Sequence, residues 1–514
     1  MSSQSNQGFG RFRSLFCPVH KSELRLFLPL VLIFFFICFN YNVLRSAKDS
    51  LVITAPSAGA EIIPFLKVWV ILPMALVMTL LFTRLANRFS LEKVFYIMMT
   101  LFLAVFVLFT AVLYPLRDLL HPHELSDRLE LLLPVGCKGL VAVMRNWTYT
   151  LFYVTAELWQ TTIMTVLFWG FANELLNVNM AKRFYVLILI GGNISAIFAG
   201  IVSRLFSDWG MRWATLSDSD PWQCSLILIT VLILLSGGIV AGIFRWLHRN
   251  TLSQKEFAYM QEEKKPEHKM SLRENFKHLA RSKYLLCIAI IVITYNICIN
   301  LTEVTWKDQL LHLCPTTNEF NAYMGKVTMW VGIVAMLIAV ISSTLIQRLN
   351  WTINAMIPPV ILLVTGVGFF TFLVFKNAPI GLAIAAFFGS TPHVLGVLFG
   401  SVQQCFSRAS KYTIFDATKE LAFIPLSKES KLKGKAAIDG VGSRLGKSGS
   451  ALAYQALLMF FGTVASTVPY VGIILLLVIV AWIVAVYTLG KQFNSLVEHH
   501  EPIEIREETT QVTT

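Results

Sequence analysis

A chain of 514 residues that is 55% hydrophobic and only 14% charged, with a mean hydropathy of +0.64, lies outside the composition of soluble globular proteins. Its formal net charge of +13 would suit a nucleic-acid-binding protein, but in so apolar a chain the placement of the charges matters more than their sum. The composition therefore predicts a polytopic membrane protein that has most of its residues in lipid.

Apolar runs of about 20 residues, the length that crosses a bilayer as a helix, recur along the chain. Twelve such runs are predicted to be transmembrane helices, and they cover residues 24–44, 62–83, 94–116, 147–173, 184–206, 223–247, 284–306, 325–346, 353–375, 380–404, 436–462 and 467–489. The sequence thus predicts an all-α polytopic fold of about twelve transmembrane helices.

The basic residues indicate how these helices are oriented. With a cytoplasmic N-terminus, 29 of the 43 Lys and Arg residues fall on the inside. Cytoplasmic loops carry the excess of Lys and Arg in membrane proteins, so we expect both termini in the cytoplasm. The N-terminal segment is too short for an organelle transit peptide and leads into a span too long for a signal peptide, which favours a bacterial inner membrane. The eight Cys residues are scattered singly, so we expect no disulfide framework, metal site or cofactor.

The first two spans carry basic residues at positions where a lipid environment disfavours charge. Arg45 and Lys48 lie at the outer end of the first span, against the general bias, either as snorkelling side chains or as parts of an extracellular gate. Lys67 lies five residues into the second run, between Pro64 and Pro73. A Lys at that depth usually faces a cavity or a carboxylate, so Lys67 is a candidate site residue.

Spans four and five add polar candidates at membrane depth. Glu157 lies near the middle of span four, and a lone carboxylate there is a functional candidate, with a structural ion pair as the alternative. In span five, small residues recur every four positions from Gly192 to Gly200, which predicts close helix packing. Asn193 is then left as a possible polar contact on the cavity side.

A long, polar and basic segment divides the spans six and six. The expected domains are residues 1–247, a cytoplasmic linker at 248–283, residues 284–490, and a disordered cytoplasmic tail at 491–514. This layout is typical of transporters built from two six-helix halves. Because no repeat between the halves is visible in the sequence, their symmetry is inferred from the layout.

The second half has embedded charges of its own. Glu303 lies inside the outer end of span seven with Lys307 one turn further on, a spacing that also fits a purely local ion pair. Arg444 and Lys447 are three residues apart and share a helix face where the eleventh run turns apolar. A cation at the mouth of a membrane helix needs an anionic or aqueous partner.

The GKS triplet at residues 446–448 suggests a phosphate loop but does not complete one. A Walker loop requires a glycine where Val441 stands, and no strand pattern precedes the triplet. A nucleotide hydrolase is therefore disfavoured, although basic residues beside a Gly-rich backbone still suit a phosphate-bearing ligand.

Several segments resemble the ATP/ADP translocase (nucleotide transporter) family of plastids and obligate intracellular bacteria such as chlamydiae. They read EIIPFLKVWVILP, FYVTAELW, VLFWGFANE followed by AKRFY, NLTEVTWK, and KYTIFDATKELAFIPL with KGKAAID and LGKSG. The resemblance spans nearly the whole chain and implies a twelve-helix fold related to the major facilitator superfamily, which moves nucleotides by alternating access. In that family a Lys in FLK, a Glu in AELW, a Glu in EVTWK and a Lys in LGKSG are important for transport. By motif they correspond to Lys67, Glu157, Glu303 and Lys447.

Two segments depart from the pattern of the family's ATP/ADP exchangers. Where those tend to read LRDTKD after the first span and GANVAL in the fifth, this chain reads RSAKD at 45–49 and GNISA at 192–196. Two modes of transport therefore stay open. Exchange of ATP and ADP, or of a broader set of ribonucleotides, is favoured by the resemblance. Proton-coupled import of nucleoside triphosphates such as GTP, UTP or ATP is the alternative, with Glu157 as its proton carrier.

We expect a substrate site between the two halves near the middle of the membrane. Lys67 from the first half would meet a phosphate chain from one side, and Lys447 with Arg444 from the other. Glu157 and Glu303 would hold these cations while the site is empty, which limits the cost of unpaired buried charge.

Other classes of protein fit the sequence less well. A membrane-embedded phosphotransferase would need clustered His or Asp at a membrane face, and a scaffold or channel would not need opposed charges in both halves. We therefore expect a transporter that is not an enzyme, with a nucleotide substrate and the lipid bilayer as partners. We expect it to be a monomer that does not bind nucleic acid.

Overall fold

The computed structural model describes residues 19–20, 23–176, 178–250, 282–426, 428–435, 437–438 and 442–499. These residues form helices and no β-strand. Ten of the described helices are long and apolar enough to cross a membrane, or eleven if one bent pair is counted as a span. The predicted all-α polytopic fold is thus confirmed.

The first half of the chain contains the helices from α2 to α12. Its spans are α2 (Leu24–Ile53), α3 (Ile62–Phe65) continued by η2 (Leu66–Ile71) and α4 (Leu72–Arg88), α5 (Leu91–Leu108) with η3 (Phe109–Leu113), α9 (Trp147–Trp159) with η5 (Gln160–Phe168) and α10 (Trp169–Leu175), α11 (Val178–Ser217) and α12 (Pro221–Asn250). Four short helices connect the third span to the fourth: α6 (Arg117–Leu120), α7 (His123–Leu132), η4 (Val135–Cys137) and α8 (Lys138–Arg145). The segments η2, η3 and η5 are turns of π-helix.

The second half contains the helices from α15 to α23. They are α15 (Lys283–Leu313), α16 (Thr317–Arg348), α17 (Trp351–Val374), α18 (Pro379–Phe387), α19 (Pro392–Ser410), the π-helical η7 (Lys411–Phe415), α20 (Asp416–Ala422), α21 (Lys428–Lys435), α22 (Ser443–Phe461) and α23 (Val464–His499). Most of the predicted linker at 248–283 falls outside the described residues. The predicted tail does not begin at 491, because α23 continues to His499.

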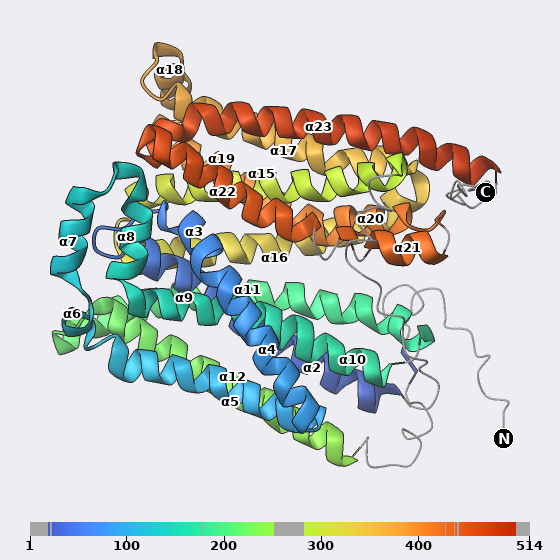
Figure 1. The fold of residues 1–514 in the computed structure, drawn as a ribbon, viewed down its shortest axis with the longest axis horizontal. Helices are drawn as coiled ribbons and strands as arrows, with labels where there is room; N and C mark the ends of the chain where they lie inside the picture. Colours follow the sequence, from blue (N-terminus) through green and yellow to red (C-terminus); the bar gives the residue numbers. More distant parts are fainter. Residues whose placement is uncertain are drawn as a thin grey trace, which may run out of the picture.

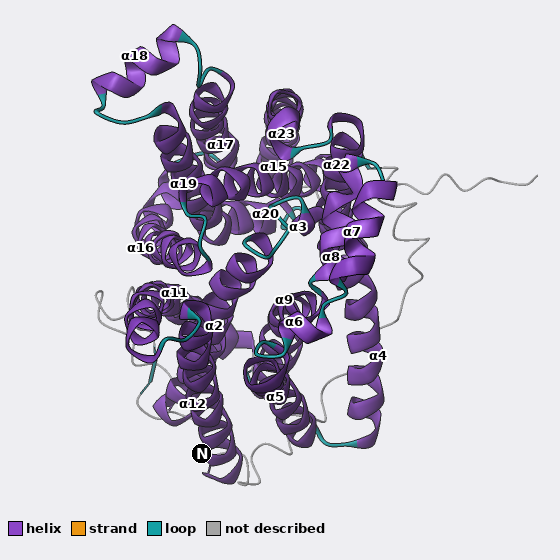
Figure 2. Ribbon diagram, turned by 90° about the vertical axis from the view of Figure 1, so that its left-hand side faces the viewer, coloured by secondary structure: helices purple, strands orange, loops and turns teal. Residues whose placement is uncertain are grey.

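The tenth predicted span is broken rather than continuous. Its two parts meet at an angle of 78° between residues 387 and 392. Gly389 adopts a left-handed conformation (φ 62°) that few other residues tolerate, and Pro392 starts the next helix because proline lacks the N–H that would continue the previous one. As a result α18 projects from the bundle, as Figure 2 shows.

The two halves lie side by side as two groups of helices (Figures 1 and 2). We call the end of the bundle where α2 begins and α23 ends the terminal end, and the end that carries α6, α7 and α8 the far end. Large apolar side chains such as Leu235, Val364 and Leu477 are more than 60% exposed, as expected where lipid is the solvent. The largest buried side chains, among them Trp159, Trp306 and Trp482, fill the interior of the halves.

Helices α11 and α16 form the most extensive contact between the halves. A Cβ atom built on Gly200 of α11 would lie 2.4 Å from the carbonyl oxygen of Gly325 on α16. No side chain fits at so close an approach, so Gly200 of the predicted small-residue stripe packs against the opposite half, whereas Gly192 faces Phe34 on α2 of its own half.

Candidate functional site

Charged side chains form a continuous network between the two halves. Lys48 Nζ lies 3.1 Å from Glu157 Oε2 and 3.0 Å from Asp49 Oδ1. Lys307 Nζ lies 2.8 Å from Asp49 Oδ2 and 2.8 Å from Glu303 Oε1. Five side chains thus alternate in charge from Glu157 on α9, through α2, to Glu303 on α15.

Glu303 is the residue of this network with the most cationic partners. Besides Lys307, its Oε1 atom accepts a hydrogen bond from Arg408 Nη2 at 3.0 Å. Its Oε2 atom lies 3.6 Å from Lys67 Nζ, and Lys67 also donates to Asn300 Oδ1 at 2.6 Å. One carboxylate therefore holds two cations from its own half and one from the first half.

We call this set the charge network. Its charged members are Lys48, Asp49, Lys67, Glu157, Glu303, Lys307 and Arg408. Four basic and three acidic side chains give it one net positive charge. Burial is deepest at the contact between the halves, where the side chains of Asp49 and Lys307 are each 1% exposed. Charges so deeply buried are tolerated because they are paired.

An aromatic ring helps to hold the first-half end of the network. Lys48 Nζ lies 3.8 Å from the centroid of the Tyr153 ring, on the helix that carries Glu157. The face of an aromatic ring attracts a cation, so the ring stabilises the ammonium group without neutralising it.

Neutral hydrogen bonds join the halves closer to the far end. The hydroxyl oxygens of Thr54 and Thr317 are 2.6 Å apart. Ser225 Oγ donates to Asn318 Oδ1 at 3.0 Å. Together with the Asp49–Lys307 ion pair, these bonds form a polar contact between the halves, which we call the seam.

Three of the spans that contribute residues to the charge network contain a π-helical segment at or close to those residues. Lys67 is itself part of η2, while η5 begins one turn after Glu157 and η7 begins one turn after Arg408. Gln160, the first residue of η5, accepts a hydrogen bond from the Tyr41 hydroxyl at 2.9 Å. Turns of π-helix inside α-helices are frequent at functional sites, because they break the regular hydrogen-bond ladder.

Three of the six predicted site residues lie together. Lys67, Glu157 and Glu303 all belong to the charge network, although Glu157 contacts Lys48 rather than Lys67. Lys48 does not snorkel, since its side chain is only 4% exposed. The local Glu303–Lys307 pair exists, and Lys307 extends it to Asp49 in the other half.

The remaining predicted residues lie elsewhere. Arg444 and Lys447 have exposed side chains on α22. Eight residues further along α22, Gln455 donates to the carbonyl of Pro64 at 2.8 Å and accepts from Trp69 Nε1 at 3.1 Å, which fixes α22 against the segment of Lys67. Lys447 is thus about 12 Å along the helix axis from this contact, toward the terminal end.

Asn193 is half-buried where α11 packs on α16. Its carbonyl oxygen lies 2.8 Å from the position of a Cβ atom built on Gly332. The structure therefore places the Asn193 backbone at a helix-packing contact and not in the charge network.

Three network residues were not found from the sequence. Asp49 lies beyond the predicted end of the first span at residue 44, but α2 continues to Ile53. Asn300 is a neutral residue within an apolar run, so its sequence context gives no signal. Arg408 follows the predicted end of the tenth span at residue 404, but the structure places Arg408 on α19. The adjacent opposite charges of Lys48 and Asp49 were the one available signal.

Comparison with known proteins gives consistent matches along the chain. The family described as TLC ATP/ADP transporter matches residues 2–493. The ADP,ATP carrier protein 1 of Chlamydia pneumoniae is 43% identical over 498 residues, which cover 96% of each chain. The chloroplastic ADP,ATP carrier protein 2 of Arabidopsis thaliana is 41% identical, with 94% of this chain and 77% of the plant protein covered.

Two solved structures show the same fold at low sequence identity. A D-xylose-proton symporter superposes with a TM-score of 0.53 at 13% identity, covering 91% of this chain and 97% of its own. A bacterial homologue of the iron transporter ferroportin in an inward-facing state gives a TM-score of 0.51 at 12% identity, covering 93% and 99%. These likenesses confirm the predicted major-facilitator-like arrangement of the helices.

Proposed function

This chain belongs to the TLC ATP/ADP transporter family, and we propose that it exchanges nucleoside phosphates across a membrane by alternating access. The substrates would be ATP and ADP or a broader set of ribonucleotides, and the protein would import host nucleotides. The observation that carries this proposal is the charge network, which puts four cations from both halves at membrane depth. The names of the chlamydial and plant relatives, which are ADP,ATP carriers, support exchange.

The charge balance of the network suits a phosphate chain. A nucleoside di- or triphosphate brings about three to four negative charges that lose water on binding, and fixed cations must replace that water. Lys67 and Arg408 reach the shared Glu303 carboxylate from different halves. We infer that the phosphates take over these cations from Glu303, so that binding replaces one set of ion pairs by another.

The seam gives a physical reason for obligatory exchange. Opening the far end requires Asp49 and Lys307 to separate, so that Asp49 keeps only Lys48 and Lys307 keeps only Glu303, and each buried charge loses one of its two partners at a cost in free energy. A bound nucleotide offsets this cost because its phosphates supply new partners for the cations. Without nucleotide, the protein would stay closed at the far end.

Arg444 and Lys447 have a separate role in this proposal. Both are exposed on α22, about 12 Å toward the terminal end from the contact that fixes α22 beside Lys67. They would attract the phosphates of the internal nucleotide that enters from that side in exchange for the imported one, and pass it to Lys67. Asn193, at the α11–α16 contact, would support the packing of the halves.

The carboxylate pairing supports exchange over proton coupling. Glu157, the candidate proton carrier, forms an ion pair with Lys48, and Glu303 and Asp49 are paired as well. A symporter needs a carboxylate that can gain and lose a proton during the cycle, whereas each of these three already neutralises a neighbouring cation.

We infer that the terminal end faces the cytoplasm and that the membrane is a bacterial inner membrane. The bias of basic residues supports this orientation. Residues 1–247 and 284–490 would move as the two halves around the site, joined by the linker at 248–283, and each monomer would form a complete transporter.

Counterflow in whole cells or proteoliposomes tests the proposal. Vesicles are preloaded with unlabelled nucleotide, and release is measured when external ATP, ADP or other ribonucleotides are added. Exchange predicts release that depends on external nucleotide and survives an uncoupler. Uptake that collapses with the proton gradient, without stimulated release, would refute it.

A further inference from the structure

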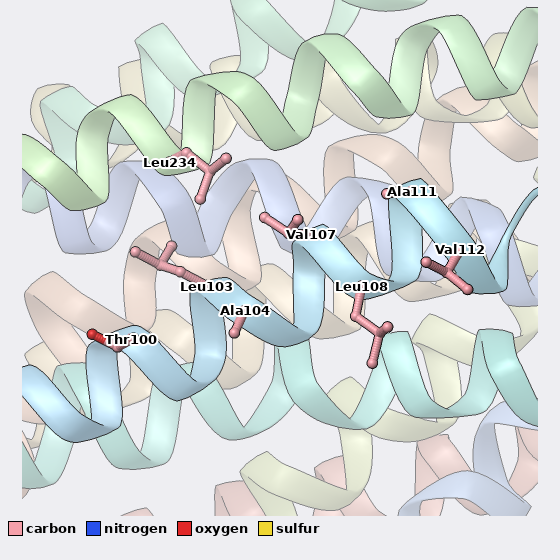
Figure 3. Close-up of a pocket in the computed structure, with 8 residues that line it drawn as sticks. All are labelled: Thr100, Leu103, Ala104, Val107, Leu108, Ala111, Val112 and Leu234. Carbon is pink, nitrogen blue, oxygen red and sulfur yellow. The ribbon is translucent and has the colours of Figure 1, made fainter.

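A shallow apolar groove follows the outward face of α5 (Figure 3). Its volume is about 570 Å³, and it extends along the helix from Thr100 through Ala104 and Leu108 to Val112, with Leu234 of α12 on one side. Thr100 is its only polar lining residue. The inward face of α5 instead packs Phe102 and Phe106 against Trp159.

The dimensions of the groove fit one lipid chain. From Thr100 to Val112 the helix axis rises about 18 Å, slightly more than one leaflet of a hydrocarbon core about 30 Å thick. The small side chains of Ala104 and Ala111 leave space between the larger ones. Because α5 is a membrane span, this space faces acyl chains rather than water.

The end of the groove near Thr100 leads to a polar and basic cluster. One turn before Thr100, the Tyr96 hydroxyl is buried and has no hydrogen-bond partner among the described residues. The Tyr96 ring packs edge-on against Phe244 of α12, with centroids 5.7 Å apart. Arg245 directly follows Phe244 on α12. Because Phe244 contacts Tyr96, Arg245 and Tyr96 lie at the same level along the two helices.

The charges of this cluster are mostly positive. Arg245 and Arg249, both exposed on α12, are close enough to the Tyr96 hydroxyl to interact with it electrostatically, and Glu92 is the acidic residue in the same surroundings. Trp246 is 45% exposed between them, and tryptophan is enriched where a span leaves the hydrocarbon region. Basic pockets between spans at this level bind anionic lipid headgroups.

We propose that the α5–α12 groove and its basic end bind one anionic phospholipid. An acyl chain lies along the groove from Thr100 to Val112. The phosphodiester group pairs with Arg245 and Arg249 and accepts a hydrogen bond from the Tyr96 hydroxyl. The site requires both an apolar chain and a negative headgroup, because the groove is shallow and the two arginines are exposed.

Native mass spectrometry of the full chain in mild detergent tests this proposal. The probes are phosphatidylglycerol and phosphatidylcholine with identical acyl chains. One phosphatidylglycerol is expected to stay bound under conditions that remove phosphatidylcholine. The variant Arg245→Gln with Arg249→Gln should lose phosphatidylglycerol affinity about tenfold, and Ala104→Phe, which fills the groove, should weaken both lipids.

Matched control variants distinguish the loss of the lipid site from general effects of the substitutions on the protein. Arg204→Gln with Arg212→Gln removes two exposed arginines near the far end of α11, and Ala481→Phe enlarges an exposed alanine on α23. These controls should bind lipid as the unmodified chain does, and circular dichroism should show all variants folded. Equal binding of the two lipids, unchanged binding in the groove variants, or full displacement by inorganic phosphate would overturn the proposal.

Discussion

The chain places cations in two regions that differ in burial. In the seam and the charge network, Lys48 and Lys307 are at most 4% exposed and are held by carboxylates. On α22, Arg444 and Lys447 are exposed, nearer the terminal end. The difference shows that basic residues next to apolar runs can be either buried against carboxylates or exposed. Buried cations hold the halves together, whereas exposed cations are accessible to a ligand from water.

The largest expected effect comes from removing the carboxylate that holds the network. Glu303→Gln leaves Lys67, Lys307 and Arg408 without their common partner, and breaking a buried pair costs roughly 3–5 kcal/mol. Nucleotide uptake should be nearly abolished, and the Tm of the purified protein should fall in a thermal-shift assay. Glu319→Gln, which changes an exposed carboxylate at the start of α16, should leave both quantities unchanged. A Glu303→Gln variant with the original Tm would contradict the structural role of the network.

Weakening the seam should change the mode of transport. Asp49→Asn keeps the shape of the side chain but removes the charge that pairs with Lys307 across the halves. We expect efflux without external nucleotide to rise about tenfold, which corresponds to a loss of roughly 1.4 kcal/mol from the barrier for the empty carrier. Efflux from preloaded vesicles into nucleotide-free buffer measures this directly. If Asp49→Asn still releases nucleotide only against external substrate, the seam does not enforce exchange.

Lys67→Ala should reduce uptake by about tenfold with a smaller loss of stability than Glu303→Gln. The Lys67 ammonium group is 3.6 Å from Glu303 Oε2, and the Lys67 side chain is 20% exposed. The Lys67–Glu303 ion pair is therefore longer and more exposed to solvent than the Asp49–Lys307 ion pair of the seam. Uptake and Tm are measured in the same preparations. Lys67→Arg, which keeps the charge, should restore part of the uptake, and uptake at the original rate in Lys67→Ala would remove this residue from the site.

The smallest expected effect on stability is at Lys447. Because this side chain is exposed on α22 toward the terminal end, Lys447→Ala should raise the KM for the internal counter-nucleotide several-fold while the Tm stays constant. The KM of the variant should also depend less on salt, since salt screens interactions between exposed charges. Lys491→Ala, at an exposed position on α23, is the matched control. A fall in Tm as large as that of Glu303→Gln would place Lys447 with the buried cations instead.

The transmembrane helices could be predicted because bilayer thickness fixes the length of an apolar run. The exceptions have local causes. The first span stops at residue 44 in the prediction because Arg45, Lys48 and Asp49 interrupt the apolar run, yet α2 continues, since Lys48 pairs with Glu157 and Asp49 pairs with Lys307 of the other half. The bend before Pro392 depends on the conformation of Gly389, which composition does not reveal.

The candidate site could be predicted only in part. Lys67, Glu157 and Glu303 stand out because isolated charges are rare in apolar runs. Their partners depend on how helices of different halves align along the membrane normal, and no periodicity within one helix encodes that alignment. For this reason Lys447 was predicted opposite Lys67, whereas the structure places Arg408 and Lys307 around the same carboxylate.

The π-helical turns have a further consequence for how this chain tolerates changes in length. Each wide turn holds one residue more than an α-turn, so the helix beyond it is rotated by about 100° relative to an uninterrupted helix. The residues on either side of η2 therefore face their neighbours only because that additional residue is present. Deleting one residue within η2 would turn α4 away from its contacts while leaving every remaining side chain intact. In these spans the number of residues is itself under constraint, independently of which residues they are.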